Sequence, residues 1–294
     1  MGRENATTGN GQPPPANALT ALWQRVVVEP MRQIDADSRR FLASPAARTV
    51  DWKTAIVLTT AAVSLTLQYY LADTQGFGTI ARVLAQIGFP AASETLFDAI
   101  RDPVSGPANK LTCWAVGAIV TYTALPLLVI SCVFREGVRN YGVKVKGAFT
   151  GFWIYGLMLV VMAPLIFLAS QSSSFQQTYP FYDVHAGEPL GRRFWRWEML
   201  YALQFFALEF FFRGFLLHGT RHRFGCYSIF VMMVPYCMIH FGKPMPEALA
   251  AIVAGIVLGF MSLKTRSIWL GAAIHVTVAW SMDFASLWRK GILG

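Results

Sequence analysis

The chain has 294 residues, of which 54% are hydrophobic and only 14% are charged. Long apolar runs recur along it, which argues against a water-soluble protein, since each membrane-spanning helix needs about 20 apolar residues. The formal net charge is +9, but Lys and Arg lie in short connections beside the apolar runs, where they set orientation and contact anionic headgroups. The sequence therefore predicts an all-α, polytopic transmembrane helical bundle with the lipid bilayer as its surroundings and no nucleic-acid partner.

The N-terminal part divides into two segments of different character. Residues 1–18 are polar and rich in proline, which predicts a disordered tail. In residues 19–50, apolar side chains alternate with arginines such as Arg25, Arg32 and Arg39, which predicts a basic amphipathic helix on the membrane surface. Amphipathicity alone fits a helix that binds a partner equally well. Residues 51–294 are predicted to form the transmembrane domain.

Seven runs in that domain are candidates to span a membrane. They lie at about 54–72, 111–134, 148–169, 194–217, 227–241, 247–263 and 268–288. The region between the first two, residues 73–110, contains Gly, Pro and a weakly amphipathic middle. A re-entrant or interfacial helix there would raise the count to eight.

The distribution of basic residues predicts the orientation. The N-terminal region and the connections at 135–147, 218–226 and 264–266 hold 15 Lys or Arg, against 9 in the remaining connections and the C-terminus when Arg213 is left out. Because positive charge accumulates on the cytoplasmic side, we expect a cytoplasmic N-terminus. With seven spans the C-terminus would lie outside, and an additional span would reverse it.

An acid and a base stand inside the fourth apolar run. Glu209 and Arg213 are four residues apart, which places them on one helical face in the favourable order. Ionisable side chains at that depth are costly and usually functional, although a salt bridge that only holds the helix explains the pair as well. Two histidines add to it: His240 at the end of the fifth run, after Tyr236, and His275 inside the seventh.

Converging from three helices, these side chains would form a polar pocket suited to hydrolysis. A glutamate in an apolar site can exchange a proton with water, and a nearby histidine can hold that water. A second donor can stabilise the oxyanion of a tetrahedral intermediate. Arg213 would orient the carboxylate.

The order and spacing of these residues resemble a known family. Glu209-xxx-Arg213-Gly214, Tyr236-xxx-His240 and His275 look like the three motifs of the CPBP (CAAX protease and bacteriocin-processing, Rce1-like) family of glutamic intramembrane proteases. The motifs lie within a core at about 194–288. The resemblance implies an intramembrane endopeptidase with Glu209, His240 and His275 as catalytic residues, supported by Arg213 and Tyr236. His240 would hold the water with Glu209, and His275 would join the oxyanion site.

The family also implies the surroundings. The substrate would be a membrane-associated protein or peptide, and no cofactor or metal would be needed. The bacterial relatives suggest a multi-pass protein of the bacterial inner (cell) membrane.

Three positions depart from the family pattern. The first motif usually begins with two glutamates, and Leu208 stands in the first position, about 100° around the helix from Glu209. Tyr236 replaces the usual Phe, and Ala279 replaces a polar residue, usually Asn, four after the histidine. Thr277 and Asp283 are polar residues near Ala279 that could compensate. Either Glu209 alone supports catalysis, or the chain is an inactive relative that acts as a membrane peptide-binding, immunity or regulatory protein.

Two further hypotheses are weaker. His218 and His222 have the spacing of helical metal ligands, but the glutamate of HExxH is missing and arginines flank the pair, which favours a solvated interfacial loop. A solute carrier that uses the buried charges is disfavoured because the sequence contains no internal repeat.

Overall fold

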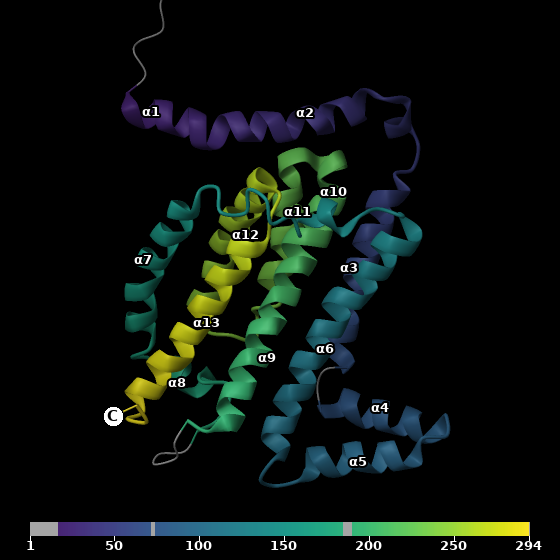
Figure 1. Cartoon of the computed structure of the whole chain (residues 1–294), viewed down its shortest axis with the longest axis vertical. Helices are drawn as coiled ribbons and strands as arrows, with labels where there is room; N and C mark the ends of the chain where they lie inside the picture. The colour runs from purple at the N-terminus through teal and green to yellow at the C-terminus, as the bar shows by residue number, and fades with distance from the viewer. Residues whose placement is uncertain (1–16, 72–73, 185–189, 294) are drawn as a thin grey trace, which may run out of the picture.

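The computed structural model describes residues 17–71, 74–184 and 190–293, and these form a bundle of long helices (Figure 1). The predicted tail at 1–18 lies almost entirely outside the described residues. The principal helices are α1 (Ala18–Trp23), α2 (Glu29–Ala43), α3 (Trp52–Leu71), α4 (Thr74–Gln86), α5 (Pro90–Arg101), α6 (Gly106–Leu128), α7 (Phe152–Ala169), α8 (Ser173–Thr178), α9 (Arg192–Glu209), α10 (Leu217–Phe224), α11 (Ser228–Met238), α12 (Met245–Thr265) and α13 (Trp269–Arg289). The described residues contain no strand, so the all-α prediction is confirmed.

Six helical segments of the described chain are long and apolar enough to cross a membrane, one fewer than predicted. The difference arises at the fourth and fifth predicted spans, which belong to one helical segment, Arg192–Met238. The chain turns at Gly225, whose φ of 54° lies in the left-handed region that favours glycine. The helix that follows, α11, has only 11 residues and is too short to count as a span.

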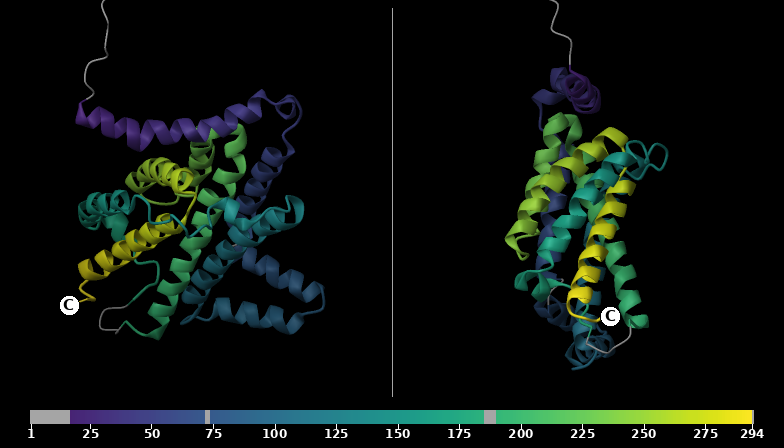
Figure 2. Two further views of the ribbon diagram at one scale, coloured as in Figure 1. Left: turned by 45° about the horizontal axis from the view of Figure 1, so that its top comes forward. Right: turned by 90° about the vertical axis from the view of Figure 1, so that its left-hand side faces the viewer.

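Residues 74–110 add no span. They contain α4 and α5, which pack against each other and lie across the ends of α3 and α6 (Figure 1). The C-terminal end of α13 lies at the end of the bundle opposite to α1 and α2 (Figures 1 and 2).

A nearly continuous helix covers the other end of the bundle. It comprises α1, a π-helical segment (Gln24–Val28) and α2, and it crosses the ends of α10 and α12 (Figures 1 and 2). We call it the strap. Asp35 accepts a hydrogen bond from the backbone N–H of Cys226 at 2.8 Å, and the Ser38 hydroxyl donates to the Arg223 carbonyl at 3.0 Å. The strap is thereby tied to the turn between α10 and α11.

The helix that carries Glu209 occupies the centre of the bundle. In the most apolar 18-residue stretch of Arg192–Met238, 78% is buried inside the bundle. The corresponding share is 11% in α7 and 39% in α12 and in α13. Phe211, Phe212 and Phe215 are fully buried there and pack against Tyr122 of α6 and Tyr141. Every residue from Ala207 to Thr220 is buried, so this part of the helix is enclosed by its neighbours.

Candidate active site

Glu209 is the last residue of α9, and its side chain is completely buried. The α-helix passes there into a π-helical segment, Phe210–Leu216, before α10 begins. Such segments are rare and are frequently found at functional sites. The π-helical segment begins directly after Glu209.

Two basic side chains meet one oxygen of this carboxylate. Arg213 Nη1 lies 2.9 Å from Glu209 Oε1, and His275 Nδ1 lies 2.7 Å from the same oxygen. The Arg213 contact is an ion pair at short distance without the alignment of a hydrogen bond, since Nη1 has no hydrogen-bond partner in the described chain. Arg213 is also completely buried, so the two charges compensate each other inside the bundle.

His275 connects the acid to a tyrosine. Its other ring nitrogen, Nε2, lies 2.9 Å from the Tyr236 hydroxyl. With a neutral imidazole, Nδ1–H donates to the carboxylate and Nε2 accepts from the tyrosine, so every group has a compatible role. This tautomer is inferred from the partners. Phe205 stacks on the ring with centroids 5.0 Å apart and holds it in place.

Tyr236 is the residue that brings the other parts together. The Arg213 guanidinium carbon lies 3.7 Å from the centre of its ring, a cation–π contact. The ring also meets that of His240 edge to face at 4.9 Å. His240 lies in the turn just after α11, half-buried, with Nδ1 2.8 Å from the Tyr236 carbonyl. Since a carbonyl can only accept, Nδ1 carries the hydrogen, and Nε2 of the neutral ring is an acceptor.

The structure therefore brings Glu209, Arg213, Tyr236 and His275 into one connected group. No hydrogen bond or ion pair joins His240 to Glu209 within the described residues, and Tyr236 stands between them. The histidine that contacts the acid is His275.

Neither Thr277 nor Asp283 replaces the polar side chain that is missing at Ala279. Ala279 packs against Tyr201 and Trp197 in an apolar cluster. Thr277 is exposed and donates to the Ala273 carbonyl within its own helix. Asp283 is buried beside Glu198 of α9 instead of near Glu209. Leu208 is buried among apolar side chains.

A glycine of α13 makes the approach to Glu209 possible. A Cβ atom added to Gly271 would lie 2.7 Å from Glu209 Oε2, closer than real Cβ contacts. Oε2 is buried and has no hydrogen-bond partner in the described chain, so its acceptor capacity is free for water. The motifs did not indicate Gly271, because only the packing of α13 against α9 reveals its role.

The histidine pair on α10 is not in a solvated loop, contrary to expectation. Both residues lie within the helix Leu217–Phe224, and His218 is buried. His218 Nε2 lies 3.2 Å from the Ser262 hydroxyl, and His222 Nε2 lies 2.9 Å from Asp51 Oδ2. Apolar contacts around α10 keep it helical despite its arginines, and each imidazole has a different polar partner.

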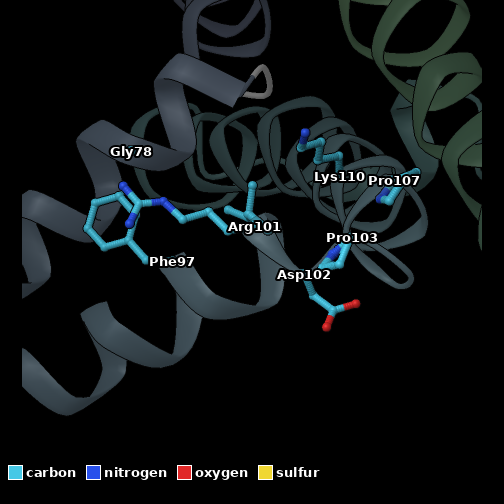
Figure 3. Close-up of a pocket in the computed structure, with 8 residues that line it drawn as sticks. Gly78, Phe97, Arg101, Asp102, Pro103, Pro107 and Lys110 are labelled. Atoms are coloured by element: carbon cyan, nitrogen blue, oxygen red, sulfur yellow. The ribbon is translucent and has the colours of Figure 1, made fainter.

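Two other features lie apart from this group. Glu198 and Asp283 are adjacent buried carboxyl groups that no basic side chain pairs with in the described part of the chain. Glu198 is 11 residues before Glu209 on the same helix, or about 16 Å along its axis. A cavity of about 390 Å³ lies between α4, α5 and α6, lined by Phe97, Arg101 and Lys110 among others (Figure 3).

Comparison with known proteins identifies the segment that contains this group. Residues 191–281 match the family model described as type II CAAX prenyl endopeptidase Rce1-like, in agreement with the resemblance seen in the motifs. Searches of curated proteins and of solved structures gave no match. The six helices able to span a membrane indicate a multi-pass membrane protein, and its residues 191–281 are similar to a family of CAAX-type membrane proteases.

Proposed function

We propose that this protein is an intramembrane endopeptidase that hydrolyses a peptide bond of a membrane-associated protein or peptide, in line with the match of residues 191–281 to the Rce1-like family model. One observation carries the proposal. A completely buried glutamate contacts an arginine and a histidine at the same carboxylate oxygen, while its second oxygen has no hydrogen-bond partner in the described chain.

In the proposed reaction, Glu209 takes a proton from a water molecule as the water oxygen attacks the peptide carbonyl carbon. The attack yields a tetrahedral intermediate with a negatively charged oxygen. When the C–N bond breaks, the nitrogen leaves with the proton that Glu209 had taken. Arg213 and His275 hold the carboxylate in position during both steps.

The polar groups beyond Glu209 have supporting roles in this mechanism. His240 Nε2, an acceptor in the neutral ring, can hold the attacking water, while His275 and the Tyr236 hydroxyl, which are bonded to each other, keep Glu209 in position. His240 is half-buried, whereas Glu209 is fully enclosed, so we propose that a substrate reaches the site from the side of His240. In this scheme Glu209 supports catalysis with Leu208 in the neighbouring position.

The test compares the termini of membrane proteins in cells that express the wild-type chain, Glu209→Gln or Glu198→Gln at matched amounts. Glu198 is a matched control because it is a buried glutamate of the same helix without contact to Glu209. We expect new termini with the wild type and with Glu198→Gln, and none with Glu209→Gln.

A second variant keeps the test informative if Glu209→Gln does not fold. His240→Gln alters a half-buried side chain that has no ion pair in the described chain, so it is expected to fold and to cleave poorly. Identical termini in all strains, with folded and abundant protein, would refute the proteolytic function and favour a peptide-binding or immunity role.

A further inference from the structure

A basic groove lies beneath the strap, at the end of the bundle opposite to the C-terminus. It has a volume of about 460 Å³ and lies between α2, α10 and α12. Arg221, Lys264 and Arg266 contribute positive charge to its walls, and Asp37 is the acidic residue among them. These residues come from α2, α10 and the end of α12, which are far apart in the sequence but meet at this end of the bundle (Figure 1).

The positive charges of the groove are only weakly compensated. Asp37 lies 4.0 Å from Arg266 and equally far from Arg40, at the outer limit of an ion pair. Arg221 forms no hydrogen bond or ion pair within the described chain; Arg266 is close enough to repel it, and Asp37 attracts it more weakly. His222 also lines the groove, but it already pairs with Asp51. Two arginines that line the same partly enclosed groove favour the binding of an anion there.

The backbone holds one of these arginines in an unusual conformation. Arg266 has φ 54° and ψ 35°, in the left-handed region that non-glycine residues rarely adopt. Glycine would end α12 there without strain. With this conformation Arg266 lines the same groove as Lys264, whose Nζ donates to the Val26 carbonyl in the middle of the strap at 3.1 Å.

The strap also indicates where the groove lies relative to the membrane. Leu19 and Trp23 of α1 are 79% and 59% exposed, as expected for a surface helix that inserts apolar side chains at the level of the lipid headgroups. The groove wall adds the apolar side chains of Ile34 and Leu263 beside the cations. A ligand at this level would combine a negative group with an apolar part.

We propose that this basic groove binds a phosphate group, with Arg221 and Arg266 as its principal partners and Lys264 as a third cation. Guanidinium groups match the geometry of phosphate oxygens and bind them through paired hydrogen bonds. The phosphate can belong to the headgroup of an anionic phospholipid or to a soluble phosphate ester. This site is separate from Glu209 and does not depend on proteolytic activity.

The experiment measures bound phosphatidylglycerol on the full chain by native mass spectrometry, after purification in a neutral detergent with equal amounts of phosphatidylglycerol and phosphatidylcholine. The wild type is compared with Arg221→Gln/Arg266→Gln. The control is Arg139→Gln/Lys144→Gln, which removes the same charge from residues that do not line the groove. We expect retained phosphatidylglycerol on the wild type and the control, and a loss of about tenfold for each groove arginine removed.

Addition of millimolar inorganic phosphate separates the two sources of the ligand. If phosphate displaces the lipid from the wild type, the site takes free phosphate as well; if it does not, the site is specific for a headgroup. If the double variant does not fold, Arg266→Gln alone, whose side chain is 59% exposed, replaces it. Equal retention of phosphatidylglycerol by the wild type and the groove variants, without an effect of inorganic phosphate, would overturn the proposal.

Discussion

Replacement of Gly271 by alanine tests the arrangement around Glu209 without changing any polar group. The new methyl carbon would lie 2.7 Å from Glu209 Oε2, whereas ordinary van der Waals contacts begin at 3.4 Å. If the carboxylate yields, it must move by about 0.7 Å, a displacement comparable to those that reduce enzymatic rates by about 100-fold. A movement of that size would also take the 2.7 Å contact with His275 towards the limit of a hydrogen bond.

The expected result is a cleavage rate lower by about 10- to 100-fold at equal amounts of protein in bilayers. If α13 moves instead of the carboxylate, the free energy of unfolding should fall by about 1–3 kcal/mol, as for other overpacked sites. Both quantities are measured, the rate with a substrate found by the comparison of termini and the stability by thermal unfolding.

Gly156→Ala is the matched control for this substitution. Gly156 lies within α7, and a Cβ atom added there meets nothing within 4 Å. This variant should cleave and unfold like the wild type. A Gly271→Ala protein that cleaves at the wild-type rate would refute the idea that the close approach of α13 positions the acid.

Three further predictions follow from buried or paired charges. Arg213→Met should reduce the free energy of unfolding by about 3–5 kcal/mol, because Glu209 loses its cation. In Glu209→Gln/Arg213→Met the reduction should be smaller than the sum of the reductions in the two single variants. Additive reductions would contradict this coupling. Glu198→Gln should raise the unfolding temperature by about 2–4 °C with unchanged cleavage, because it removes one of two adjacent buried carboxyl groups. A lower unfolding temperature of the variant would show that Glu198 and Asp283 stabilise the fold. Burial raises the pKa of Glu136, but hydrogen bonds from Lys53 and Tyr141 outweigh it, so the pKa lies below its ordinary value of 4.5. Its stabilisation is therefore present above pH 4.5 and lost as the pH falls below it, and the difference in thermal stability between wild type and Glu136→Gln should shrink in that range.

Much of the site could be predicted because its spacing is local. Glu209 and Arg213 share one helical turn, so their pairing follows from the sequence. The contact between Glu209 and His275 could not be derived in the same way, since it depends on the rotation and height of α13 relative to α9. The same is true of Tyr236, whose hydroxyl reaches His275 from α11. The resemblance indicated which residues converge, but not which of them touch.

The fold shows a similar division between local and distant causes. Hydropathy predicted the all-α bundle and the long spans, because apolar length is a local property. It did not predict that α11 would be short, since the apolar run continues to Phe241 while the helix ends at Met238. Glu198 is also an ionisable residue inside a predicted span, so the rule that indicates Glu209 applies to it, but no motif of the resemblance contains it.

The ties between the strap and the turn at Gly225 have a mechanical consequence. That turn separates the helix that supplies Glu209 from the helix that supplies Tyr236 and leads to His240. Because Asp35 and Ser38 hold residues on both sides of Gly225, the strap cannot lift from the bundle without breaking these hydrogen bonds or pulling on the ends of α10 and α11. A force that pulls on the strap is therefore transmitted through α10 and α11 and changes the distance between Glu209 and Tyr236.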